Sequence, residues 1–146
     1  MRHLIAVTML MLSILLVACG GKAGAQNEAG REIKTAEGSY RNISPAQLSA
    51  MLKDKNFLLV NVHIPYEGEI SPTDLFIPYN EVEQNLARFP RNKGEKIVLY
   101  CRSGSMSAIA ARTLVRLGFS NVWNLDGGML AWAKEGYTIN QKPRGS

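Results

Sequence analysis

The stretch YCRSGSMS at residues 100–107 has the residue types of a nucleophilic loop. Cys101 follows the strand-forming run KIVLY, and the short segment 102–106 separates it from a helical pattern. The thiolate is the reactive form of cysteine, and backbone N–H groups and a helix N-terminus both favour it over the thiol. Gly104 permits a backbone conformation that a Cβ atom would disfavour. The stretch therefore predicts an anion-binding loop curled around a reactive sulfur.

Three alternative roles for Cys101 differ in what else they require. A buried structural cysteine at a strand end is a frequent role for this residue and stays open. Cysteine phosphatases and arsenate reductases need an arginine six positions after the cysteine to bind a tetrahedral oxyanion, and Ser107 stands there. A disulfide oxidoreductase is disfavoured because the chain's other cysteine, Cys19, makes no C-x-x-C pair with Cys101.

The elements that must position this loop alternate between strands and helices. Ser44, Pro45 and Gln47 have the pattern of a capped helix start. The alternation predicts an α/β fold, with a parallel β-sheet flanked by helices on both faces. Binding sites of such sheets form at the carboxyl ends of the strands, where Cys101 lies. Strands are predicted at 57–62, 75–79, 96–100 and 121–125, and further helices at 80–89, 107–117 and 129–135.

The N-terminus carries a different signal. Arg2 and His3 precede fifteen mostly apolar residues, which is the length of a secretory signal core and short for a membrane span. This run ends in LVAC at residues 16–19, which resembles a bacterial lipobox. The resemblance implies that a signal peptide, residues 1–18, is removed and that Cys19 is lipidated. An ordinary signal peptide with an incidental cysteine is the alternative.

The lipobox resemblance also implies a location. Acyl chains on Cys19 would anchor the protein to a membrane of the cell envelope. Gly20 rather than Asp follows that cysteine, which implies the periplasmic side of the outer membrane if the host is Gram-negative. Residues 20–38 are rich in Gly and Ala without apolar periodicity and predict a flexible tether. The expected organisation is thus a signal peptide (1–18), a lipidated cysteine with its tether (19–38) and one domain (39–146).

Composition limits the classes of function. A chain of 146 residues has room for one domain of ordinary size. Its formal net charge is +5, but no block of Lys or Arg concentrates that charge. Nucleic-acid binding is therefore not expected, and the sequence indicates no particular protein partner.

The segments YCRSGSMSAIAA and LGFSNVWNLDGGMLAW together resemble the rhodanese family of sulfurtransferases, over residues 39–142. The resemblance implies a rhodanese-like sheet and a persulfide mechanism. Cys101 would take a sulfane sulfur from thiosulfate, a persulfide or a polysulfide, and pass it to cyanide or a thiol. Neither a metal nor an organic cofactor is implied. The resemblance also implies a substrate-binding loop made of Arg102, Ser103, Gly104, Ser105, Met106 and Ser107.

Two departures from the family pattern affect the surroundings of this loop. Many members carry an Asp-x-Arg pair after the strand at 57–62, where this chain has Asn61-Val62-His63. Met106 stands where many relatives have arginine, which removes a cation from the pocket mouth. His63 is more simply a surface or structural residue than a general base, and Glu67 and Glu69 are expected in a solvated loop rather than as a carboxylate pair. A second hypothesis therefore stays open: a non-catalytic or weakly catalytic sulfur-carrier or binding module.

Overall fold

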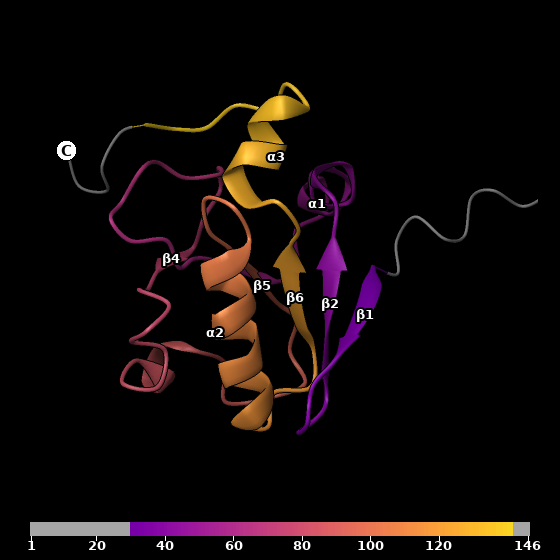
Figure 1. Cartoon of the computed structure of the whole chain (residues 1–146), viewed down its shortest axis with the longest axis vertical. Coiled ribbons are helices and arrows are strands. Elements are labelled where there is room, and N and C mark those ends of the chain that lie inside the picture. The colour runs from indigo at the N-terminus through magenta and orange to yellow at the C-terminus, as the bar shows by residue number, and fades with distance from the viewer. Residues whose placement is uncertain (1–29, 142–146) are drawn as a thin grey trace, which may run out of the picture.

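A single six-stranded sheet organises the protein (Figure 1). The computed structural model describes residues 30–141. The strand order is β1-β2-β6-β5-β3-β4, with β1 antiparallel to β2 and the other neighbours parallel. The strands are β1 (Arg31–Lys34), β2 (Ser39–Ile43), β3 (Leu58–Asn61), β4 (Leu75–Phe76), β5 (Ile97–Tyr100) and β6 (Val122–Leu125). The helices are α1 (Pro45–Leu52), α2 (Ser105–Arg116) and α3 (Gly128–Lys134), with one 3₁₀ turn, η1 (Leu86–Arg88). The predicted α/β class is confirmed, although the sheet is mixed at one edge.

The hairpin of β1 and β2 corrects the predicted tether. That tether spans 20–38, yet β1 lies within it and pairs with β2 from Arg31 opposite Asn42 to Lys34 opposite Ser39. Only Ile33 of β1 packs against the core, so the strand has no apolar alternation that would identify it. The tether prediction is wrong for these residues. The signal peptide, Cys19 and the tether up to residue 29 lie outside the described residues.

The helix predicted at 80–89 is also wrong, because the segment forms turns and the single 3₁₀ turn η1. The Asn85 side chain donates to the Glu81 carbonyl at 2.8 Å, a local hydrogen bond that competes with helix formation. Pro90 disfavours a helical conformation at Phe89, whose φ and ψ of −88° and 160° are extended. Val82 and Phe89 are nevertheless buried, so their apolar spacing reflects core contacts made from turns.

The start of α1 is confirmed as the sequence predicts it. Ser44 accepts a hydrogen bond from the Gln47 amide, and the Gln47 side chain accepts one from the Ser44 amide, at 3.2 and 2.8 Å. Helix α2 begins at Ser105, two residues earlier than expected. Within residues 30–141, no helix combines the length and the hydropathy that a membrane span requires.

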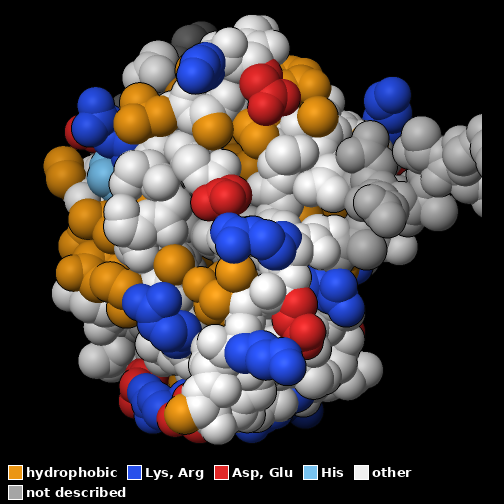
Figure 2. All heavy atoms as spheres, turned by 45° about the vertical axis from the view of Figure 1, so that its right-hand side comes forward, with side chains coloured by type: hydrophobic (Ala, Val, Ile, Leu, Met, Phe, Trp, Pro, Cys, Tyr) orange, Lys and Arg blue, Asp and Glu red, His pale blue; other side chains and the backbone are white. Residues whose placement is uncertain are grey.

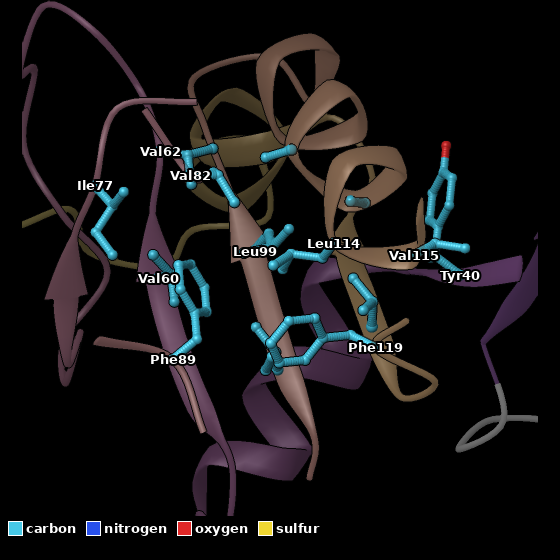
Figure 3. Close-up of a cluster of buried hydrophobic side chains, with 14 of the residues drawn as sticks. Tyr40, Val60, Val62, Ile77, Val82, Phe89, Leu99, Leu114, Val115 and Phe119 are labelled. Carbon is cyan, nitrogen blue, oxygen red and sulfur yellow. The ribbon is translucent and has the colours of Figure 1, made fainter. Parts of the chain in front are cut away.

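Alternate residues of the strands enter two separate cores. On one face, Val60 and Leu99 pack with Leu114 and Val115 of α2, as Figure 3 shows. On the other face, Val98 packs with residues of α1 and α3. Helices therefore cover both faces of the sheet. Burial of β5 on both of its faces fixes the position of its carboxyl end.

Tyr100 and Cys101 belong to different cores because successive side chains of a strand point to opposite faces. The buried Tyr100 hydroxyl accepts a hydrogen bond from the Ile70 amide at 3.0 Å and lies 2.6 Å from the Thr73 hydroxyl. Burial raises the pKa of Tyr100 well above its usual range, so the side chain stays neutral. The end of β5 is thereby tied to the segment that leads into β4.

Candidate functional site

The sulfur of Cys101 lies at the carboxyl end of β5, inside the loop that connects the strand to α2. The residue is 1% exposed. Its Sγ accepts a hydrogen bond from the Gly104 amide at 3.0 Å, and the Ser107 hydroxyl lies 3.4 Å away. Gly104 adopts a φ of 92°, the left-handed region that a side chain disfavours. The loop therefore curls around the sulfur as predicted.

The Ser107 hydroxyl is placed to support a negative charge on this sulfur. It lies 3.2 Å from the Gly104 carbonyl as well as 3.4 Å from Sγ, and it has only one proton to donate. The Ala108 amide already donates to that carbonyl at 3.0 Å. The single Ser107 proton can point to either acceptor, and an anionic sulfur would attract it more strongly than the neutral carbonyl does.

Helix α3 holds the loop from its other side. The Met129 amide donates to the Cys101 carbonyl and the Leu130 amide to the Arg102 carbonyl, each at 2.9 Å. The peptide bonds after Cys101 and Arg102 are trans, so each following N–H points opposite to its carbonyl. The N–H groups of Arg102 and Ser103 therefore point away from α3. The backbone of the loop is therefore fixed in orientation by main-chain contacts.

Gly128 makes this contact possible. Its φ is 57°, and a Cβ atom at this position would lie 2.3 Å from the Cys101 carbonyl oxygen and 2.7 Å from that of Arg102. Atoms at those distances overlap, so a larger residue would displace the loop. The glycine pair after β6 is thus part of the site, although its sequence indicates only a turn.

The predicted loop residues take different positions. Gly104 and Ser107 contact the sulfur. The exposed hydroxyls of Ser103 and Ser105 lie 2.8 Å apart. Met106, in the first turn of α2, is half-buried and packs against the core.

Arg102 forms an ion pair that no sequence pattern indicates. Its Nε lies 3.1 Å from Oε2 of Glu67, and the same oxygen lies 3.1 Å from Nε2 of His63. Glu67 lies in a solvated loop as expected, with its side chain 44% exposed, but its carboxylate is ion-paired. His63 is 7% exposed; its Nε2 is within hydrogen-bond distance of Glu67, whereas its buried Nδ1 has no partner among the described residues. Residues 67 and 102 are 35 positions apart (102 − 67), so no local pattern could have paired them.

Asn61 explains how the fold does without the Asp-x-Arg pair. Its side chain is fully buried, donates to the Gly68 carbonyl at 2.9 Å and accepts from the His63 amide at 3.0 Å. A carboxylate at this position could only accept. Asn61 thus connects both ends of the segment that carries Glu67, without any buried charge.

In the part of the chain that the structure describes, the other surface features form no second reactive site. A hollow of about 700 Å³ is lined by Arg31, Ser44, Asp126 and their neighbours, and Cys101 is not among its lining residues. Figure 2 shows basic and acidic side chains interspersed over one face, without a large basic patch there. Among residues 30–141, no group of three or more His, Cys, Asp or Glu side chains is arranged to hold a metal ion.

Comparison with known proteins gives consistent matches. The family model described as "Rhodanese-like domain" matches residues 44–135, more than half of the chain. A sulfurtransferase of Allochromatium vinosum is 36% identical over 101 residues, which are 66% of this chain and 92% of that protein. A tRNA uridine(34) hydroxylase of Escherichia fergusonii is 29% identical over 104 residues, but the match spans only 29% of its length. The crystal structure of a rhodanese-related protein from Thermoplasma volcanium superimposes with a TM-score of 0.61 at 29% identity, over 70% of this chain and all of that one.

Proposed function

Because this chain belongs to the rhodanese-like domain family, we propose that it is a sulfurtransferase that carries sulfane sulfur as a persulfide on Cys101. The main support is the arrangement of Gly104 and Ser107, which direct two hydrogen-bond donors at one buried sulfur. Such donors favour the thiolate, which is the nucleophile in exchange at sulfur. A buried structural cysteine would not need them.

In the first half-reaction, the Cys101 thiolate attacks the outer sulfur of the donor. A bond forms between Sγ and that sulfur while the S–S bond of the donor breaks. Thiosulfate then releases sulfite, and an organic persulfide R–S–SH releases the thiolate R–S⁻, each leaving with the bonding electron pair. Sulfur is transferred as a neutral atom, so the step needs no external oxidant or reductant.

In the second half-reaction, the acceptor attacks the outer sulfur of the Cys101 persulfide. Cyanide gives thiocyanate, and a thiolate acceptor gives a new persulfide. The electron pair of the broken S–S bond returns to Sγ and regenerates the thiolate. Gly104 and Ser107 stabilise that charge both before the first step and after the second, so the loop assists Cys101 as nucleophile and as leaving group.

Intact-mass spectrometry tests the persulfide directly. Incubation with thiosulfate or an organic persulfide is expected to add about 32 Da, the mass of one sulfur atom. Subsequent cyanide should remove this mass and release an equal amount of thiocyanate. Folded protein that gains no mass from either donor would contradict the proposal. A stable adduct that cyanide or thiols discharge only once, without turnover, would support the sulfur-carrier alternative instead.

We further propose that Cys19 is lipidated and anchors the domain to a membrane of the cell envelope. The support is the apolar run that ends in LVAC. Expressed with its own N-terminus, the protein should partition into detergent and begin at Cys19. The Cys19→Ala variant should lose both properties, and equal membrane binding by this variant would contradict the proposal.

A further inference from the structure

Arg102 is the only basic residue of the loop from Cys101 to Ser107. Its side chain is 55% exposed, so it is accessible to a charged donor. Its Nε, however, lies 3.1 Å from the Glu67 carboxylate, which His63 also contacts at 3.1 Å. The charge of the guanidinium is therefore balanced at short range by a carboxylate of another segment.

The position of Glu67 is fixed by neighbouring backbone contacts. The Asn61 side chain binds the Gly68 carbonyl at 2.9 Å. Glu69 and Asn140 exchange two backbone hydrogen bonds, of 2.9 and 2.8 Å. On the other side of the ion pair, the Arg102 carbonyl is held by the Leu130 amide. Both partners are thus supported by main-chain contacts, which keep the carboxylate beside the guanidinium.

Such an exposed ion pair contributes little to folding stability. Its larger effect is on the field that a charged molecule meets at the loop. A free guanidinium would attract a dianion such as thiosulfate, whereas a guanidinium paired with a carboxylate presents no net charge. Met106, at the position where a second cation would stand, supplies none either.

We propose that Glu67 is a specificity-determining residue, which neutralises Arg102 and so lowers the loop's preference for dianionic donors relative to organic persulfides of low charge. This inference depends on the proposed sulfurtransferase function. It assigns the substrate class to sulfane donors that carry at most one negative charge. It also gives His63 a role, because the His63 ring contacts the same carboxylate oxygen and helps to hold it in place.

The Glu67→Gln variant tests this role. Glutamine keeps the shape and an acceptor oxygen for Arg102 and His63 but removes the charge. We expect kcat/KM for thiosulfate to rise about tenfold, which corresponds to about 1.4 kcal/mol. With 2-mercaptoethanol persulfide as donor, kcat/KM should change by less than about twofold. An equal change for both donors, or none for thiosulfate, would overturn the inference.

Glu83→Gln is the matched control. Glu83 forms an ion pair with Arg116, at the opposite end of α2 from the loop. The substitution removes the same carboxylate charge from an Arg–Glu pair. Arg116 lies about 16 Å along α2 from Ser105, where the helix begins, since each residue of a helix rises about 1.5 Å. We expect it to change neither rate constant by more than about twofold. If Glu83→Gln raised kcat/KM for thiosulfate as much as Glu67→Gln does, the gain would come from the protein's net charge alone. That result would overturn the inference.

The double variant Glu67→Gln/Arg102→Gln separates pairing from other effects. It removes both charges, so kcat/KM for thiosulfate should return to within about threefold of the wild type. A gain that persists without Arg102 would overturn the inference.

The wild-type protein provides a test that does not depend on a variant folding. Its kcat/KM for thiosulfate should change by less than about twofold between about 0.02 and 0.2 M ionic strength, whereas a free cation would give a steep fall. Such a fall would overturn the inference. Failure of the wild type to take sulfur from either donor would refute the proposed function itself, which is a different result.

Discussion

Replacement of Cys101 by serine is expected to lower kcat/KM for sulfur transfer by at least about a thousandfold. A serine oxygen forms no persulfide, and the loop offers its two hydrogen bonds to a hydroxyl that stays protonated. Steady-state formation of thiocyanate from thiosulfate and from an organic persulfide measures the loss. The same variant should show no added sulfur by intact-mass spectrometry.

The Cys101→Ser variant should fold normally, because the Gly104 amide and the Ser107 hydroxyl can hydrogen-bond to an oxygen in place of sulfur. Denaturant unfolding should therefore give a midpoint close to that of the wild type. Turnover that persists in a folded serine variant would mean that the transferred sulfur never resides on Cys101.

The second large effect is expected from Gly128→Ala. The new Cβ atom would overlap the carbonyl oxygens of Cys101 and Arg102, so the loop or α3 must move apart. Movement weakens the hydrogen bonds from Met129 and Leu130 that orient the loop. We expect kcat/KM to fall about a hundredfold and the free energy of unfolding to fall by about 2–4 kcal/mol. Kinetics and denaturant unfolding of the same preparation measure both.

Gly136→Ala is the control for this prediction. Gly136 has a φ of +86°, so alanine is strained there as well, but no atom lies within 4 Å of the place that its Cβ atom would take. The variant should lose about 1 kcal/mol of stability and keep its activity. Equal activities of the two alanine variants would show that contact with α3 does not shape the loop.

Local sequence signals predicted the parts of the fold that short-range physics determines. The capping box at Ser44 and Gln47 and the loop glycine at Gly104 depend on neighbours a few residues away. The buried strands β3 and β5 show continuous apolar runs because both of their faces are covered. These signals were sufficient to place Cys101 at the end of a strand and inside a turn.

Long-range contacts determine the features that local patterns did not predict. Strand β1 is stabilised by pairing with β2 rather than by its own apolar pattern. The apolar spacing of Val82, Leu86 and Phe89 matched a helix, but Pro90 and the side chain of Asn85 favour turns. Glu67 and Arg102 meet because two distant loops converge at the carboxyl edge of the sheet.

The antiparallel direction of β1 has a consequence for how sulfur compounds reach Cys101. Because β1 runs against β2, the chain enters the fold beside the carboxyl ends of β2 and β6, where Arg31 pairs with Asp126 at 3.7 Å. That is the edge of the sheet at which β5 ends in Cys101. With the proposed lipid on Cys19, the ten residues 20–29 span at most about 36 Å. The reactive edge would then be the membrane-proximal side of the domain, and its substrates would be drawn from the thin aqueous layer at the lipid surface.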